Sequence, residues 1–160
     1  MVNLVYPKGH KATWHQQAMD ICDGKTQLSE DELPDLLGWL VDYNWPGAHS
    51  IARFLCDHAG AILPAVNSVL TTSPDMKWKY WLIVTLVLQW PRRHVAKLQP
   101  SLRAIAEGSD ADEAHVVALE ALAKNNLIDR GEARAMLERK LREFPQLKVD
   151  LLEVRQAMEQ

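Results

Sequence analysis

The sequence is poor in glycine, in cysteine and in long apolar runs. Seven of its 160 residues are glycine, which argues against sandwiches, barrels and the glycine-rich loops that bind nucleotides. The two cysteines, Cys22 and Cys56, form no Cys-x-x-Cys pair, so we expect neither a disulfide framework nor a zinc site built on them. We expect both to be small buried residues of a protein in the reducing cytoplasm.

Membrane and export signals are also missing. The longest strongly apolar run, Trp81 to Leu88, has eight residues and includes Thr85, whereas a membrane span needs about 20. The first 17 residues, MVNLVYPKGHKATWHQQ, lack the apolar core of a signal peptide. The sequence therefore predicts a cytoplasmic protein that has no membrane partner.

Charge is present but unevenly spread. The net charge is −3, with a balance of −4 over residues 1–74, +5 over 75–105 and −4 over 106–160. The basic segment is either an anion-facing patch or simply the charged outer faces of amphipathic helices.

The aromatic composition is unusual as well, with six Trp against three Tyr and two Phe.

Apolar residues recur at helical spacing along most of the chain. Trp14, Ala18, Ile21 and Cys22 share one helical face, and Gly24 ends that helix. The same pattern, with turn residues between, predicts helices over about 12–23, 33–41, 46–58, 61–70, 74–90, 100–107, 109–124, 130–144 and 145–160. Residues 92–98 form a turn or a short helix. We expect Gly60 to end the helix over 46–58.

Two helix starts have clear signals. Ser29 to Glu32 matches a capping box, although Pro34 favours a start nearer Leu33. Ser73, with Pro74 after it, is typical of a cap followed by the first helical residue. The apolar half of the 74–90 segment, 82–88, could instead be a buried strand, but no other segment could pair with it. We predict a helix there and expect it to be the most buried one.

The expected architecture is all-α, with eight to ten helices joined by tight turns. Successive antiparallel pairs indicate a short right-handed α-solenoid or an irregular bundle. A length of 160 residues predicts a single domain over 1–160, which we divide into a repeat-like core over 28–108 and a C-terminal helical extension over 109–160.

Two tryptophan motifs carry a family resemblance. The motif W-L-x-D-x-N-W-P lies at 39–46 and W-K-Y-W at 78–81. Together with the leucine-rich helix pairs around them, they resemble HEAT repeats. The motifs resemble, more narrowly, a family of small bacterial HEAT-like proteins, domain of unknown function 5071, over about residues 28–102. That resemblance implies a fold and no established activity.

The same motifs and the basic segment supply the candidate binding residues. Indole N–H groups often sit at a groove edge, and a groove with Trp, Tyr and basic side chains could hold an acidic peptide or nucleic acid. The alternative is that they cap a turn and pack the core. We expect the tryptophans of the motifs to gather at one central repeat junction. The candidates are Asp42, Asn44, Trp45, Trp78, Lys79, Trp81, Arg92 and Arg93.

No sequence pattern points to catalysis. Cys56, His58 and His49 are metal-ligand types, but no two histidines here have the i, i+4 spacing of a helical zinc pair. Serine-hydrolase, zinc-protease and phosphate-loop motifs are missing. We therefore predict no catalytic residue, no metal and no cofactor.

The leading hypothesis is a non-enzymatic module that binds a partner protein, such as an adaptor or an immunity protein that blocks a toxin. A second hypothesis is nucleic-acid binding, because some HEAT-like DNA glycosylases use tryptophans, basic residues and an aspartate on a concave face. The chain holds these residue types at Asp42, Trp45, Trp78, Trp81, Arg92 and Arg93. The net charge of −3 speaks against it. A third is a structural subunit of a larger assembly.

Overall fold

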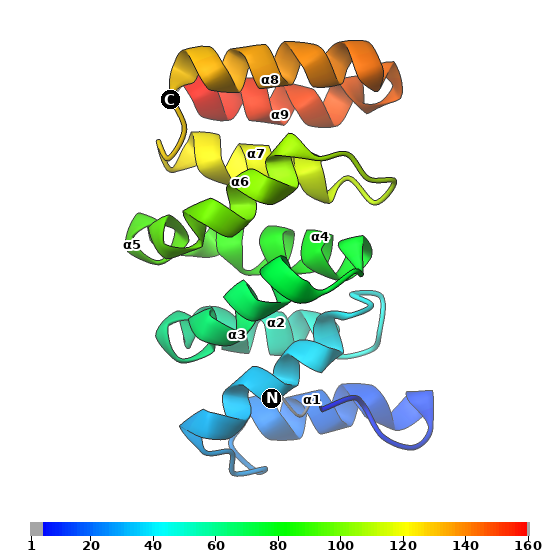
Figure 1. Ribbon diagram of the computed structural model, residues 1–160. Coiled ribbons are helices and arrows are strands. Elements are labelled where there is room, and N and C mark those ends of the chain that lie inside the picture. The colour runs from blue at the N-terminus through cyan, green and yellow to red at the C-terminus, as the bar shows by residue number, and fades with distance from the viewer. Residues whose placement is uncertain (1–4, 160) are drawn as a thin grey trace.

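The computed structural model describes residues 5–159, with 148–150 as backbone alone. Within that range helices are the only regular secondary structure, which confirms the all-α prediction (Figure 1). The described part holds nine α-helices: α1 (Trp14–Cys22), α2 (Ala48–Cys56), α3 (Ala59–Thr72), α4 (Met76–Thr85), α5 (Arg92–Val95), α6 (Gln99–Glu107), α7 (Ala114–Lys124), α8 (Arg130–Glu143) and α9 (Lys148–Glu159). Between them lie the 3₁₀ helices η1 (Lys11–Thr13), η2 (Glu30–Leu40), η3 (Val87–Gln89), η4 (Ala96–Leu98) and η5 (Pro145–Leu147).

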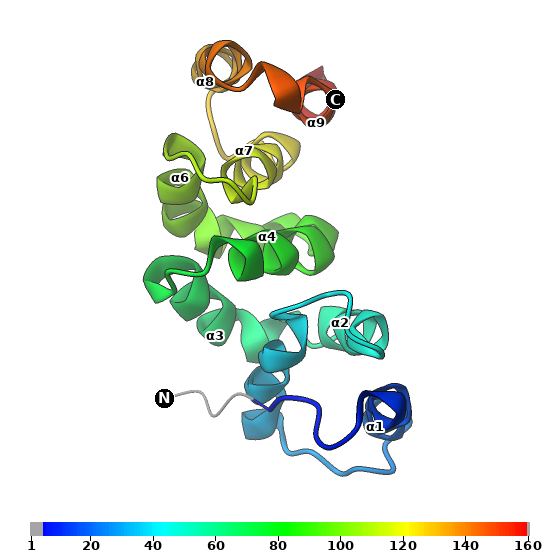
Figure 2. The ribbon, with the colours of Figure 1, turned by 90° about the vertical axis from the view of Figure 1, so that its right-hand side faces the viewer.

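Successive helices alternate between two layers of one stack. One layer holds α1, α2, α4, α7 and α9, and the other holds η2, α3, α6 and α8 (Figure 2). In Figure 2 the stack bows, with α4 and α7 set back from α1 and α9, so the first layer lies on the concave side. We call it the inner layer and the other one the outer layer. Across the described residues, no helix is both long and apolar enough to cross a membrane.

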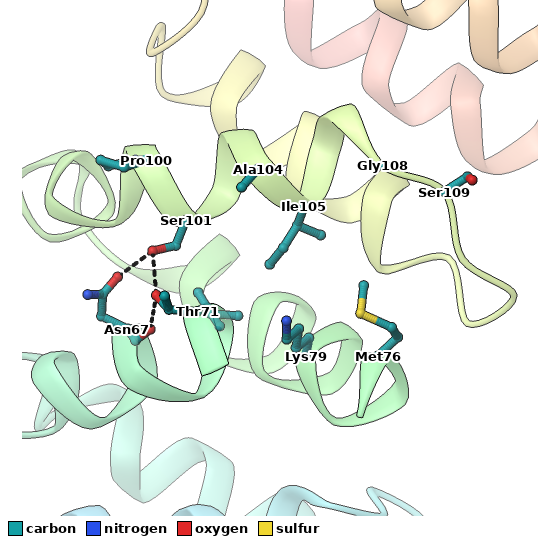
Figure 3. A pocket seen from close by; sticks show the side chains of 11 residues that line it. Asn67, Thr71, Met76, Lys79, Pro100, Ser101, Ala104, Ile105, Gly108 and Ser109 are labelled. Atoms are coloured by element: carbon teal, nitrogen blue, oxygen red, sulfur yellow. Dashed lines mark hydrogen bonds between the residues drawn. The ribbon is translucent and has the colours of Figure 1, made fainter. Parts of the chain in front are cut away.

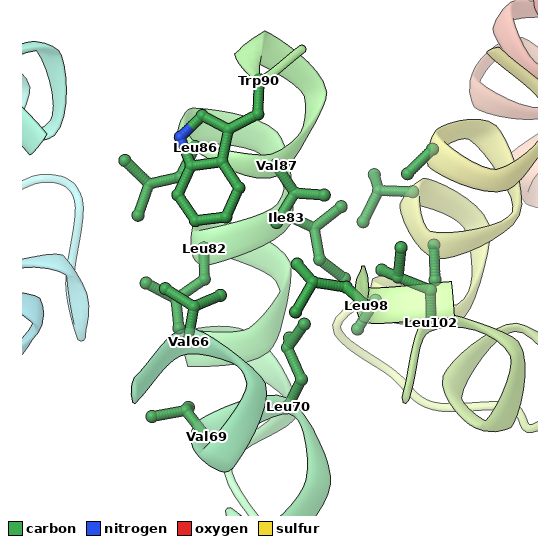
Figure 4. Packing of buried hydrophobic residues seen from close by; sticks show 14 of the residues in the cluster. Val66, Val69, Leu70, Leu82, Ile83, Leu86, Val87, Trp90, Leu98 and Leu102 are labelled. Carbon is green, nitrogen blue, oxygen red and sulfur yellow. The ribbon is translucent and has the colours of Figure 1, made fainter. Parts of the chain in front are cut away.

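The buried apolar side chains form one continuous core from Ala18 to Val154. Its centre lies where α3, α4, η3, η4 and α6 meet (Figure 4). Side chains from all five elements pack there: Val66, Leu70, Leu82, Ile83, Leu86, Val87, Leu98 and Leu102. The helix prediction for the apolar run is confirmed as far as Thr85, and the strand alternative is wrong.

The most completely buried helix is α7 and not the apolar helix α4, contrary to the prediction. Nine of the eleven residues of α7 are buried, because α4, α6, α8 and α9 pack around it. Its small alanine side chains let these neighbours approach closely. In contrast, α4 leaves Trp81 and Val84 half-buried.

The end of α2 and the start of α3 differ from the prediction. The helix α3 begins at Ala59, so Gly60 lies in its first turn instead of stopping α2. The backbone N–H groups of Ala61 and Ile62 both donate to His58 O, so the chain reverses within Asp57 and His58. A two-residue connection replaces the expected glycine stop.

The helix α4 is shorter than predicted at both ends. Its N-cap is Asp75, whose Oδ1 accepts a hydrogen bond from Trp78 N at 2.9 Å, so Ser73 is not the cap. Its α-helical pattern ends at Thr85, and Leu86 follows as the C-cap at φ −117°, with its N–H donating to Leu82 O. The remaining predicted residues continue as η3.

The segment predicted as a helix from Leu33 is the 3₁₀ helix η2, which begins earlier, at Glu30. Its capping pair is present, since Ser29 N donates to Glu32 Oε2 at 2.9 Å. Pro34 has no N–H and would press its ring on the carbonyl of Glu30 in an α-helix. The tighter 3₁₀ winding accommodates it.

Candidate functional site

The predicted site residues Asp42, Asn44 and Trp45 lie in the turn between η2 and α2. Asp42 Oδ1 accepts hydrogen bonds from N and Nδ2 of Asn44, at 3.0 and 3.1 Å. The Trp45 ring stands edge-on to Trp14 of α1, with 5.5 Å between ring centroids. The turn is therefore a packed corner between α1 and α2.

Trp78 and Trp81, one helical turn apart on α4, have different surroundings. Trp78 is 8% exposed, and its Nε1 donates to Leu37 O at 3.2 Å. Trp81 is half-buried, and its ring centroid lies 5.1 Å from that of Tyr43. Trp45 thus contacts α1, Trp78 bonds to η2 and Trp81 contacts Tyr43. No ring contact or hydrogen bond in the described part of the chain joins the three tryptophans to one another.

A cavity of about 810 Å³ runs along α2 between α1 and α4, on the inner layer. We call it the inner groove. Tyr43 lines one end, where its ring stacks on His49 at 4.1 Å with an angle of 18°. Farther along are charged and apolar side chains. The full lining is Met19, Cys22, Tyr43, Ser50, Ala52, Arg53, Phe54, Cys56, Asp57, Val84, Thr85 and Gln89.

Both cysteines are free thiols in the wall of the inner groove, half-buried instead of fully buried as expected. Cys22 Sγ donates to Ser50 O at 3.5 Å, and Cys56 Sγ donates to Thr85 O at 3.3 Å. Burial raises the pKa of both thiols above the ordinary value. They stay protonated at neutral pH, whereas a reactive cysteine needs a lowered pKa.

The basic side chains of segment 75–105 have different surroundings. Arg92 on α5 donates from Nε to Asn125 O at 2.8 Å, and Arg93 beside it is exposed. Lys79 is buried near the other end of the α4–α5 segment. Arg103 forms ion pairs with carboxylates of α6 and α8. Arg92, Lys79 and Arg103 are therefore held in separate local interactions.

Lys79 lines a second cavity, of about 560 Å³, between α3, α4 and α6 (Figure 3). We call it the Lys79 pocket. Its lining is Asn67, Leu70, Thr71, Met76, Lys79, Pro100, Ser101, Ala104, Ile105, Gly108 and Ser109. Lys79 was among the predicted groove residues, whereas this pocket was not predicted.

A buried polar cluster where α6, α7 and α8 meet was also missed. His115 is fully buried and contacts Asp110 through Nδ1 and Oδ2, 2.9 Å apart. Lys140 is 1% exposed and donates from Nζ to Gly108 O at 2.9 Å. Burial lowers the pKa of both groups, that of Lys140 to about 8. The sequence held one sign that Lys140 is buried. Lys140 lies three residues after Leu137, so both residues fall on the apolar face of α8.

Metal-ligand types do not converge in the part of the chain that the structure describes. Within it, no three His, Cys, Asp or Glu side chains are placed to hold a metal ion. His49 stacks on Tyr43, and His58 Nδ1 lies 2.8 Å from Phe54 O. The inner groove is lined by an aromatic pair, two thiols and charged side chains, and the Lys79 pocket by hydroxyl, amide and apolar groups with one amine.

Comparison with known families places the chain. A family model described as a domain of unknown function (DUF5071) matches residues 13–127, more than half of the sequence. The chain belongs to the DUF5071 family. The DUF5071 match extends beyond residues 28–102 in both directions and covers the inner groove and the Lys79 pocket. Searches of curated proteins and of solved structures give no match.

Proposed function

We propose that this DUF5071 protein is a non-enzymatic cytoplasmic module that binds a partner protein through its inner layer. In this proposal the helices pair antiparallel as a short HEAT-like α-solenoid. The alternation of successive helices between two layers supports that architecture (Figure 2). Stacked helix pairs of this kind offer extended concave surfaces to other proteins.

The inner groove is the observation that carries the proposal. Tyr, Trp and Arg are the residue types that most often dominate binding energy at protein interfaces. Tyr43 and Arg53 line this groove, and Trp81 lies against Tyr43. The Tyr43 ring is already held between His49 and Trp81, so a partner that packs on it loses little side-chain entropy.

Nucleic-acid binding has less support. A protein that binds a phosphate backbone needs basic side chains along one face. Here Arg103 is paired with carboxylates, Lys79 is buried and the net charge is −3. A gel shift at low salt with micromolar protein discriminates between the two functions, and we expect no shifted band.

Site-specific photocrosslinking in the source organism tests the proposal. A photoreactive residue replaces His49 or Arg53, both exposed on the inner layer, or Ser68, exposed on α3 of the outer layer as the matched control. We expect one and the same protein to be captured from positions 49 and 53 and not from 68. With that partner purified, Arg53→Ala should raise the Kd about tenfold or more.

Equal capture from both layers, or no capture from the inner layer, contradicts the proposal. Capture of a second copy of this chain, together with concentration-dependent dimerisation, favours a structural subunit instead. A captured toxin that loses activity in the complex assigns the immunity role, and any other captured protein assigns the adaptor role.

A further inference from the structure

The Lys79 pocket differs in chemistry from the inner groove. Its volume of about 560 Å³ falls in the range of small-molecule sites, about 300–1,000 Å³. It lies between the outer helices α3 and α6 and the first turns of α4 (Figure 3). Its polar groups come from all three helices.

Lys79 is the cation of this pocket, and it is only 7% exposed. Its Nζ forms no hydrogen bond and no ion pair with the side chains or backbone that the structure describes. Asp110 attracts it through charge alone, because both Asp110 oxygens accept hydrogen bonds in the turn that leads into α7. Burial lowers the pKa of Lys79 below the ordinary value.

The stem of Lys79 is buried, but its Nζ is not among the fully buried side-chain nitrogens that lack a partner, so the ammonium faces the pocket. A methionine of similar length would bury the same stem without placing a charge there. Buried groups of this kind, aimed into a cavity, cluster where proteins meet ligands. Lys79 therefore gives the pocket one cation that forms no ion pair with the side chains that the structure describes.

The rest of the lining is part polar and part apolar. Ser101 Oγ donates to Asn67 Oδ1 at 2.6 Å and lies 3.1 Å from Thr71 Oγ1 (Figure 3). Thr71 Oγ1 in turn donates to Asn67 O at 2.8 Å. Because both hydroxyl protons are used, the free lone pairs here can accept hydrogen bonds. Met76 and Ile105 supply apolar wall between this group and the far end of the pocket.

We propose that the Lys79 pocket binds a small monocarboxylic acid. Its carboxylate bonds the Lys79 ammonium, and its apolar body lies against Met76 and Ile105. One amine balances one negative charge. Gly108, at the C-terminal end of α6, also borders the pocket, and the negative end of the helix dipole disfavours a dianion such as phosphate. This site is separate from the inner groove and independent of the protein-binding proposal.

An NMR titration of the ¹⁵N-labelled full chain tests the site. The probes are sodium butanoate, butanamide as the uncharged analogue and inorganic phosphate as the other anion. We expect saturable shifts of the pocket amides with butanoate alone. Lys79→Met should weaken butanoate binding about tenfold or more. Lys77→Met, at an exposed lysine of the same helix outside the pocket, is the control and should leave binding unchanged.

Thermal unfolding gives a second readout that does not depend on peak assignment. Without butanoate, Lys79→Met should melt at or above the wild-type Tm, because methionine keeps the buried stem and removes the charge that burial disfavours. Butanoate should raise the Tm of the wild type and not that of the variant. If Lys79→Met does not fold, Lys79→Gln takes its place.

Three results overturn the proposal. One is pocket binding of butanamide or phosphate as tight as that of butanoate. Another is equal butanoate binding by the wild type and the Lys79 variant. The third is the lack of any saturable shift at the pocket amides.

Discussion

Lys79 and Lys140 are both buried near the C-terminal end of α6, yet the two regions treat the ammonium group differently. Lys140, on α8, donates to Gly108 O. In contrast, Lys79, on α4, lines a cavity that Gly108 also borders. Burial lowers the pKa of both amines. The Lys140 ammonium therefore has a hydrogen-bond acceptor within the fold. The Lys79 ammonium has none and can bind a ligand in the pocket.

The position of each lysine explains the difference. Unpaired carbonyls at a helix C-terminus attract cations, through hydrogen bonds and through the helix dipole. Lys140 reaches such a carbonyl from α8 and so fastens α8 to the end of α6. Lys79 approaches from α4, beside the hydroxyls of Thr71 and Ser101. We infer that the first lysine holds the fold together and that the second one serves a ligand.

Truncation of the two lysines should separate these roles most strongly. Lys140→Ala leaves a cavity and an unsatisfied Gly108 carbonyl, at a cost of about 2–4 kcal/mol in free energy of unfolding. Lys79→Ala removes an unpaired charge along with its stem, so its cost should be smaller by at least about 1 kcal/mol. Urea denaturation of both variants at pH 7 measures the difference. Equal costs would show that Lys79 is as structural as Lys140.

The pH dependence of stability should sharpen the same comparison. Lys140 has a pKa of about 8 in the folded chain against 10.5 as the ordinary value. Between these values the unfolded chain holds more protons, so the free energy of unfolding rises with pH. Below pH 8 both states are charged and the penalty for burying the charge is fully present.

We therefore expect the wild type to gain about 2–3 kcal/mol relative to Lys140→Met between pH 7 and 10.5. Urea denaturation of both chains at the two pH values measures this relative gain, because groups that titrate alike in both cancel. A constant difference between the two chains would mean that Lys140 keeps its ordinary pKa in the fold.

The smallest effects on stability should come from the inner groove. His49 and Arg53 are exposed, so their alanine variants should change the free energy of unfolding by no more than about 0.5 kcal/mol. The same variants should lose the partner that is captured at this face. A large loss of stability would show that these residues support the fold, as Lys140 does, and would remove the contrast between the two regions.

The existence and order of the helices could be predicted from apolar spacing, but several ends could not. Asp129 directly precedes the predicted helix 130–144 and is a typical N-cap residue. Its side chain accepts hydrogen bonds from Gly131 N and Glu132 N. Gly60 reads as a stop, yet it lies inside α3. A glycine costs only about 1 kcal/mol within a helix, and packing of α3 against its neighbours outweighs that.

The candidate site was predictable in its residue types and not in its geometry. Trp78 and Trp81 are equivalent in the sequence, but the chain turns one toward Leu37 and the other toward Tyr43. Lys79 was named as one cation of a surface patch, and the structure buries it. Lys140 carries no local signal of a polar partner, because Gly108 is 32 residues away.

The sequence by itself determined the all-α class, the helical segments and the family, because apolar periodicity, caps and the tryptophan motifs act over short distances. Only the tertiary structure decided which tryptophans and lysines are buried, and which of the buried cations has a partner. These properties depend on which face of each helix meets its neighbours. That choice is made by the packing of segments some 30 to 40 residues apart, as the hydrogen bonds of Trp78 and Lys140 show.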